Sequence, residues 1–198
     1  APQLRAKALQ KVGGRLAVLY GNHRRADQLL QESVSILRKN GDQLHLAWAL
    51  MHLSHVNKES AHAEEALGLF VALGENAGYA WTINELGEQA RHNGRYEDAK
   101  HYYEECLALA EELDNSKLKA VALNNLGYTL INLERYHAAH IRLQDALKIA
   151  TDIDSAILSV IILAGLASLA AFTNDFETAA TLFGYTDQAQ SKLCFEIE

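Results

Sequence analysis

The sequence predicts an all-α fold, a right-handed solenoid of about five helix–turn–helix repeats. Three observations lead to this prediction. A shift of forty residues aligns the chain with itself, and each aligned unit has a leucine, then a small residue and later an alanine. These are Leu86-Gly87 with Ala99, Leu126-Gly127 with Ala139, and Leu166-Ala167 with Ala179. Both halves of each unit have helical apolar spacing. The 198 residues include one proline, Pro2, and almost no clustered glycine, which leaves room for ten helices in one domain, residues 1–198.

Each regular unit is expected to form an antiparallel pair of helices. A polar turn followed by an aromatic residue joins the two halves: Asn93-Gly94-Arg95-Tyr96, Leu133-Glu134-Arg135-Tyr136 and Asn174-Asp175-Phe176. A Gly or Asn in this turn favours the left-handed residue that ends a helix. The small residue at 87, 127 or 167 is expected to let the paired helices approach closely, with the alanine of the second helix facing it.

The expected repeats follow one another along the whole chain. The first, about 4–41, aligns Gly14 with Gly87, and its adjacent glycines Gly13 and Gly14 weaken its first helix. The second, about 42–76, lacks seven residues around 57–63. Either its turn and the start of its second helix are shortened, or a loop is missing from the sequence. The third to fifth repeats cover about 77–115, 117–154 and 155–185, and a C-terminal helix is expected over 186–198.

The fifth repeat is unusually apolar. No charged residue occurs from Ser155 to Asn174, a stretch long enough to span a bilayer. These residues keep the repeat register, however, which favours a packed repeat helix. A terminal repeat normally exposes a polar side, so something is expected to cover this one. The C-terminal helix from about Thr186, a second copy of the chain or the rest of a longer protein could do so, and the expected self-association face contains Ile157, Ile161 and Phe172.

Charge and cysteine content limit the partners and the location. The net charge of −7 argues against a nucleic-acid surface, which needs clustered Lys and Arg, and no membrane contact is expected. Cys106 occupies a small core position and Cys194 lies near the end, so a structural disulfide is not expected and a cytoplasmic location is predicted. Because the chain starts with Ala1 rather than Met, we expect a fragment of a longer protein.

The sequence contains no pattern that predicts catalysis or a metal site. The pairs His52/His55 and His137/His140 have i, i+3 spacing, but spacing fixes no third and fourth ligand, so no metal is expected. Adjacent glutamates such as Glu104-Glu105 point about a hundred degrees apart on a helix. No nucleophile with a base and an orienting group is evident, and there is no phosphate-binding loop. We therefore expect a protein that is not an enzyme and has no cofactor.

The repeat pattern resembles the tetratricopeptide repeat. That family has a small residue at position 8, Ala at 20 and bulky apolar residues at 4, 7 and 24. The forty-residue spacing exceeds the usual thirty-four, and the consensus proline is missing. Three phrases, Ala47-Trp48-Ala49-Leu50, Leu123-Asn124-Asn125-Leu126-Gly127-Tyr128 and Ala179-Ala180-Thr181-Leu182-Phe183-Gly184, resemble the C-terminal repeats of large bacterial LuxR-type regulators with a nucleotide-binding switch (STAND-like). This resemblance implies a sensor or scaffold segment, with ATP and DNA binding located elsewhere.

The same resemblance implies a concave groove lined by the first helix of each repeat, at positions 2, 5, 6, 9, 12 and 13. The residues at these positions that we select as a ligand or peptide groove are Trp81, Asn84, Glu88, Arg91, Asn124, Asn125 and Tyr128. Asn offers a donor and an acceptor to an extended peptide, and aromatic rings add flat apolar contact. Three Asn residues have poor helix propensity and gain nothing locally, which favours binding as their role.

Three functions are compatible with these features. The first is a non-catalytic scaffold that binds a protein or peptide segment, including other domains of its parent, as the sensor or interaction segment of a multidomain bacterial transcriptional regulator. The second is a small-molecule sensor with a cleft near Trp48 and Trp81. The third is a homodimerisation module that uses the apolar fifth repeat.

Overall fold

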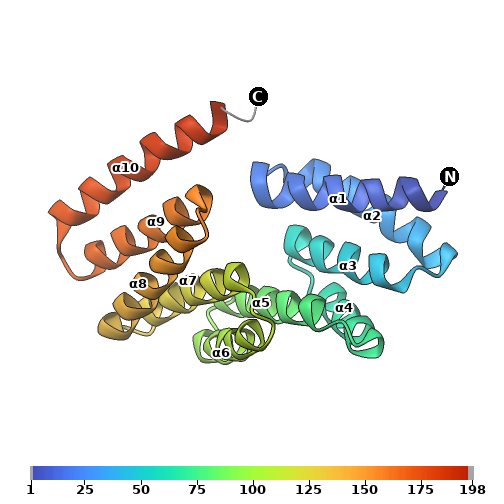
Figure 1. Ribbon diagram of the computed structural model, residues 1–198, viewed down its shortest axis with the longest axis horizontal. Helices are drawn as coiled ribbons and strands as arrows, with labels where there is room; N and C mark the ends of the chain where they lie inside the picture. Colours follow the sequence, from blue (N-terminus) through green and yellow to red (C-terminus); the bar gives the residue numbers. More distant parts are fainter. Residues whose placement is uncertain (1, 196–198) are drawn as a thin grey trace. The chain divides into compact units, whose positions relative to one another are not determined.

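The computed structural model describes residues 2–195, and these residues form ten α-helices joined by loops of two or three residues (Figure 1). The all-α repeat fold is confirmed. The helices are α1 (Pro2–Tyr20), α2 (His23–Asn40), α3 (Gln43–Asn57), α4 (Ser60–Leu73), α5 (Asn76–His92), α6 (Tyr96–Glu112), α7 (Ser116–Asn132), α8 (Tyr136–Asp152), α9 (Ala156–Phe172) and α10 (Phe176–Phe195).

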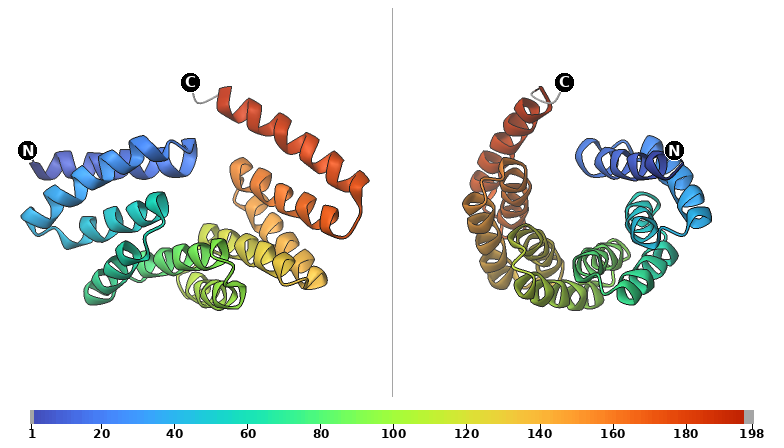
Figure 2. Two further views of the ribbon diagram at one scale, coloured as in Figure 1. Left: turned by 180° about the vertical axis from the view of Figure 1, so that it is seen from behind. Right: turned by 45° about the vertical axis from the view of Figure 1, so that its right-hand side comes forward.

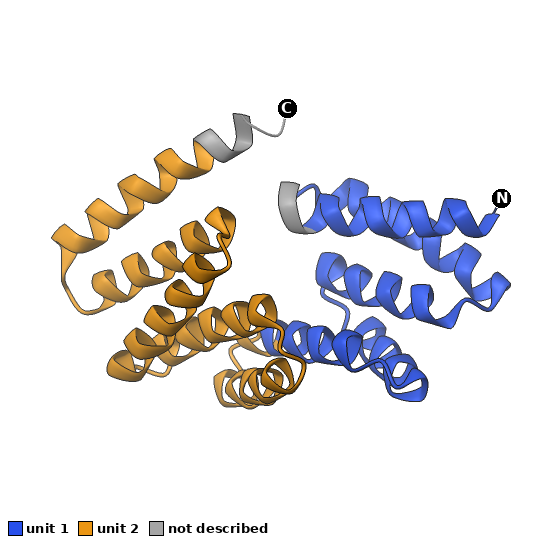
Figure 3. Cartoon of the chain, viewed as in Figure 1, with its two compact units in different colours: residues 1–89 blue, residues 90–198 orange. Residues whose placement is uncertain are grey.

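The chain divides into two compact units, residues 1–89 and 90–198 (Figure 3). Unit 1 contains α1 to α4 and most of α5, and unit 2 contains the end of α5 and α6 to α10. Each unit has its own apolar core, centred on Leu30, Leu50 and Phe70 in unit 1 and on Leu126 and Leu143 in unit 2. That the whole chain acts as one domain stays a prediction.

The first repeat differs by one residue from the expected register. Gly13, not Gly14, gives α2 its close approach, because a Cβ at Gly13 would lie 2.7 Å from Leu30 Cγ. Gly14 lies against the His52 ring of α3 instead. The cause is one extra residue between Leu16 and Asn22: the Asn22 N–H donates to the Leu16 carbonyl, six residues back, whereas the equivalent bond in the fourth repeat spans five residues. The alignment of Gly14 with Gly87 is therefore off by one.

The second repeat is shortened in both helices and in the turn between them. Helices α3 and α4 have 15 and 14 residues, whereas α5 to α9 have 17 each. A loop of two residues, Lys58-Glu59, replaces the three-residue turn between the helices of the later repeats. Gly74 takes the left-handed conformation after α4 that Asp114 takes forty residues later after α6, so the missing length lies before Gly74, which agrees with the stretch 57–63 where the sequence places it. Lys58 ends α3 in the left-handed conformation, with φ of 59°.

Unit 2 is built on close approaches at two glycines. Helices α7 and α8 pack as an antiparallel pair, and so do α9 and α10 (Figure 2). A Cβ at Gly127 of α7 would lie 2.6 Å from Leu143 Cγ of α8, and one at Gly165 of α9 would lie 2.9 Å from Leu143 Cδ2. Leu143 is fully buried. The first side chain to meet Gly127 is thus Leu143, one turn beyond the expected Ala139.

The turns that end the first helices adopt the expected left-handed conformation. Gly94 has φ of 72° and Asn174 has φ of 64°, which confirms the role given to Gly and Asn. Glu134 takes the same conformation in the fourth repeat, with φ of 57°, although it has a Cβ. Its N–H donates to the Ile131 carbonyl and that of Arg135 to the Leu130 carbonyl, so two helix-end acceptors are satisfied.

The apolar fifth repeat is a packed pair of helices, as predicted. Helix α9 packs on α7, α8 and α10, and among the described residues no helix has the length and apolar content needed to span a membrane. Helix α10 continues unbroken to Phe195, so residues from Thr186 onward are the end of this helix and not a separate helix, and 196–198 lie outside the described residues. Ile157, Ile161 and Phe172 are 42%, 41% and 58% exposed.

The core position expected for Cys106 is confirmed. Its side chain is fully buried in α6, and burial raises the pKa of the thiol to about 12. A thiol held neutral in this way reacts slowly, because the thiolate is the nucleophile. The side chain of Cys194 lies outside the described residues.

The close approach at Gly127 predicts opposite effects for two Gly→Ala changes in unit 2. Gly127→Ala should lower the free energy of unfolding by about 1–3 kcal/mol, because its Cβ would overlap Leu143. Gly184→Ala on α10 meets no atom within 4 Å and should raise it by about 0.5–1 kcal/mol, since Ala is the better helix former. Urea unfolding followed by circular dichroism measures both, and equal effects would show that Gly127 has no packing role.

Candidate functional site

A polar cluster lies where α7 meets α9 in unit 2. Asn124 and Tyr128 stand one turn apart on α7, and both contact Gly165 of α9. A Cβ at Gly165 would lie 3.3 Å from Tyr128 Cε2 and 3.4 Å from Asn124 Oδ1. Gly165 therefore lies directly against both groups. We call Asn124, Asn125, Tyr128, Gly165 and Ser168, together with Arg91, the unit 2 surface.

The Asn124 side chain of this surface is buried and has an unpaired oxygen. It is 5% exposed, and its Nδ2 donates to Asn125 Oδ1 at 3.4 Å. Its Oδ1 is buried and accepts no hydrogen bond from the described residues. An unpaired buried acceptor costs about 1–3 kcal/mol, so its presence requires an explanation.

Tyr128 and Arg91 flank Asn124. The Arg91 guanidinium carbon lies 6.0 Å from the centre of the Tyr128 ring, the outer limit of a cation–π contact. Tyr128 also shares a hydrogen bond with Ser168 of α9, and burial raises the pKa of its hydroxyl, so Tyr128 is neutral near pH 7. The Arg91 Nε is buried without a hydrogen-bond acceptor. The surface thus contains an unpaired donor on one side and an unpaired acceptor on the other.

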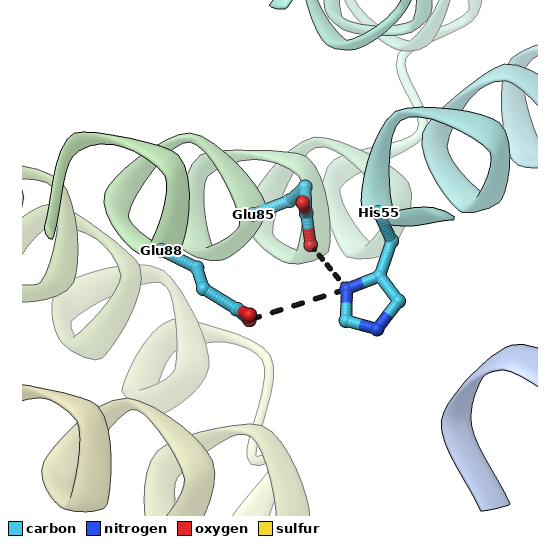
Figure 4. Close-up of side chains that lie close together, drawn as sticks. All are labelled: His55, Glu85 and Glu88. Atoms are coloured by element: carbon cyan, nitrogen blue, oxygen red, sulfur yellow. Dashed lines mark hydrogen bonds and ion pairs between the residues drawn. The ribbon is translucent and has the colours of Figure 1, made fainter. Parts of the chain in front are cut away.

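A charged cluster in unit 1 joins α3 to α5 (Figure 4). His55 Nδ1 lies 2.8 Å from Glu85 Oε2 and 4.0 Å from Glu88 Oε2. Lys58 Nζ lies 3.2 Å from Glu88 Oε1 and 3.9 Å from Glu85 Oε1. The Glu85 side chain is only 5% exposed. Gln89 Nε2 donates to Glu85 Oε1 at 3.3 Å and to Ser54 Oγ at 2.6 Å, which fixes the orientation of the buried carboxylate.

The two histidines of α3 have opposite environments. The hydrogen bond to Glu85 raises the pKa of His55, since the carboxylate favours the imidazolium. Burial lowers the pKa of His52 to about 4, with a smaller contribution from His55. His52 lies against Gly14 of α1, whereas His55 points to α5, so the pair does not act as one ligand set. His137 and His140 are exposed on α8.

The selected groove residues fall into two groups. The first group lies in unit 2 and contains Arg91, Asn124, Asn125 and Tyr128. Arg91 lies near the Tyr128 ring, and Asn124 is hydrogen-bonded to Asn125 and shares the contact at Gly165 with Tyr128. The remaining three lie in unit 1: Trp81 is partly buried beside the core, Asn84 is 6% exposed, and Glu88 belongs to the charged cluster. A shared ligand for all seven stays a prediction.

Sequence reasoning missed residues of both clusters. His55 and Glu85 are thirty residues apart, so neither local spacing nor helix periodicity relates them. The signal was nevertheless present: with the second repeat aligned at its shift of thirty-three, His55 and Glu88 occupy the same groove position of successive repeats. Gly165 and Ser168 fall at groove positions of the fifth repeat in the same way. The shortened second repeat and the apolar fifth repeat had hidden these positions.

Comparison with known proteins identifies the repeat. The tetratricopeptide repeat model matches residues 78–152. These residues are tetratricopeptide repeats. They comprise most of α5 and all of α6, α7 and α8. No curated protein sequence is significantly similar to the chain. Tetratricopeptide repeats generally act as non-enzymatic scaffolds for protein interaction.

Solved structures extend the tetratricopeptide-like fold over the whole chain. The repeats of a putative kinesin light chain from Podosopora anserina are 17% identical, with a TM-score of 0.61 over 97% of each chain. A Rap protein complexed with Competence and Sporulation Factor is 16% identical, with a TM-score of 0.80 over 90% of this chain and 52% of that chain. A STAND protein with a tetratricopeptide repeat sensor from Pyrococcus horikoshii is 15% identical, with a TM-score of 0.60 over 100% of this chain and 38% of that chain. At these identities the likeness shows the fold alone.

The lowered pKa of His52 predicts a loss of stability in mild acid. Between pH 6.5 and about 4 the unfolded chain binds a proton at this residue that the folded chain does not, so the free energy of unfolding falls as the pH falls. In His52→Gln this fall between pH 7 and 4.5 should be smaller by about 2 kcal/mol. Urea unfolding at several pH values measures it, with exposed His140→Gln as the control. An unchanged pH dependence in His52→Gln would contradict the assignment.

Proposed function

We propose that this chain is a non-catalytic protein-interaction module whose unit 2 surface binds an extended peptide segment. The observation that carries the proposal is the buried, unpaired Oδ1 of Asn124. This atom lies beside Gly165, the one glycine of α9, where α9 comes close to α7. Rotation of the Asn124 side chain toward solvent on binding would let a peptide N–H satisfy this acceptor. The same Asn can donate its Nδ2 to a peptide carbonyl, so one side chain can hydrogen-bond to both the N–H and the C=O of a peptide residue.

The neighbours of Asn124 suit such a ligand. Arg91 brings a positive charge and an unpaired Nε donor, which can hold a carboxylate or a carbonyl oxygen. Tyr128 adds a flat ring that a ligand can displace or stack on. Along α9, Ile161, Gly165, Ser168 and Phe172 follow one another at i, i+4, i+7 and i+11, so they share one helical face. Exposed apolar side chains therefore border the polar centre, as expected for a surface that binds alternating groups of a peptide.

We further propose that the module is the sensor or interaction segment of a multidomain bacterial transcriptional regulator. Two similarities support this. The similar Rap protein forms a complex with Competence and Sporulation Factor, and the similar STAND protein carries its tetratricopeptide repeats as a sensor. The chain covers only 52% and 38% of these two proteins, which is consistent with a repeat segment attached to other modules.

The peptide proposal is tested by selection from a library of short random peptides on the immobilised chain. Peptides that the wild type enriches should bind Asn124→Ala/Asn125→Ala about tenfold more weakly, as expected for about 1.4 kcal/mol of lost hydrogen bonding. Fluorescence anisotropy of labelled peptides gives the affinities. Gln144→Ala, which removes an exposed amide on α8, is the matched control and should bind normally. Equal binding by the Asn variant, or no enrichment at all, would refute the proposal.

Homodimerisation is the second candidate function, favoured by the exposure of Ile157, Ile161 and Phe172. Residues 157 and 161 are one turn apart on α9 and extend the same helical face as Gly165. A second copy of the chain would cover this apolar face.

Sedimentation velocity over a range of concentrations tests the dimer. The wild type should associate, and Ile161→Asp should weaken association at least tenfold, because a charge would be buried in an apolar interface. Val71→Asp changes an apolar residue of α4 that is 63% exposed, so it is the control and should leave association unchanged. A wild-type chain that stays monomeric at the highest concentration would exclude this function.

A further inference from the structure

Two acidic side chains and one imidazole converge on a single point in unit 1. His55 Nδ1 and one carboxylate oxygen each from Glu85 and Glu88 all lie within 4.8 Å of one another (Figure 4). Side chains from α3 and α5 are thus held together by the packing of successive repeats. We propose that His55, Glu85 and Glu88 form a binding site for a Zn²⁺ ion.

The geometry is close to that of a zinc site. Ligand atoms in a tetrahedral zinc site lie about 3.3 Å apart, given metal–ligand distances near 2.0 Å. His55 Nδ1 and Glu85 Oε2 are already 2.8 Å apart, and Glu88 Oε2 is 4.0 Å from the same nitrogen. A small rotation of the Glu88 side chain, which is 22% exposed, brings the third ligand into range. The fourth position is left to water, and the His23 ring, whose centre lies 6.3 Å from that of His55, provides a further nitrogen beside the site.

The surroundings of the cluster favour a bound cation. Glu85 is almost fully buried, and a buried carboxylate is costly unless a positive charge compensates it. Gln89 and Ser54 form the outer hydrogen bonds that orient Glu85, as outer partners do for the ligands of established metal sites. Imidazole with carboxylate is a donor set that suits Zn²⁺.

Lys58 contributes positive charge to this cluster in the absence of an ion. Its ammonium nitrogen lies 3.2 Å from Glu88 and 3.9 Å from Glu85. The side chain is 42% exposed and follows the end of α3, so it can turn into solvent when an ion enters. Lys58 and Zn²⁺ therefore compete for the same carboxylates, which gives the site an unusual property: removal of Lys58 should strengthen metal binding.

Calorimetric titration of the metal-stripped, untagged chain with Zn²⁺ tests the site. One ion per chain should bind to the wild type. Affinity should fall at least tenfold in His55→Ala and Glu85→Gln, and rise several-fold in Lys58→Met. The control His137→Ala/His140→Ala removes an exposed histidine pair from α8 and should bind as the wild type does. Co²⁺ should give a visible absorption band that needs His55.

The outcomes separate the proposal from its alternatives. Absence of saturable binding, undiminished binding by His55→Ala, loss of binding in the His137/His140 control, or weaker binding by Lys58→Met would each overturn it. Circular dichroism shows whether the variants fold. If loss of His55 or Glu85 unfolds the chain, Glu88→Gln decides the question, because its partly exposed side chain tolerates replacement. It must bind Zn²⁺ at least tenfold more weakly for the site to stand. The peptide proposal does not depend on this result.

Discussion

The packing of Leu143 between two glycines holds unit 2 together. Leu143 of α8 meets Gly127 in its own helical pair and Gly165 in the next pair, so one buried side chain connects three helices. A single pair of helices cannot bury its apolar face, and its stability comes from the neighbouring pair. Because a Cβ at either glycine would lie less than 3 Å from Leu143, the two glycines and the leucine are constrained together.

The polar cluster of unit 2 is a consequence of that packing. The close approach at Gly165 brings α9 against Asn124 and Tyr128, and it covers the Asn124 oxygen without providing a donor. The stability lost at this acceptor is small beside the apolar burial around Leu143, so the fold tolerates it. The core beneath therefore holds the Asn124 oxygen in an incompletely hydrogen-bonded state.

Unit 1 has the corresponding arrangement with charges in place of amides. The shortened second repeat still places His55 opposite Glu88 in the next repeat, and Glu85 is buried between them with its oxygens oriented by Gln89. The same repeat geometry thus positions neutral polar groups in one unit and an imidazole with two carboxylates in the other. The surface-facing residues of the first helix of each repeat differ between the units and set the local chemistry. The small and bulky residues at the core positions maintain the fold.

The sequence alone determined the all-α repeat fold, because small residues, alanines and bulky apolar residues recur at fixed positions and each position has one packing role. It also indicated Cys106 as a core residue, and Gly94 and Asn174 as left-handed helix ends. Only the tertiary structure decided the register of the first repeat, since one extra residue between Leu16 and Asn22 exchanges the roles of Gly13 and Gly14. It likewise decided which polar groups meet, because contacts such as that between His55 and Glu85 join residues thirty positions apart and depend on how successive helices pack.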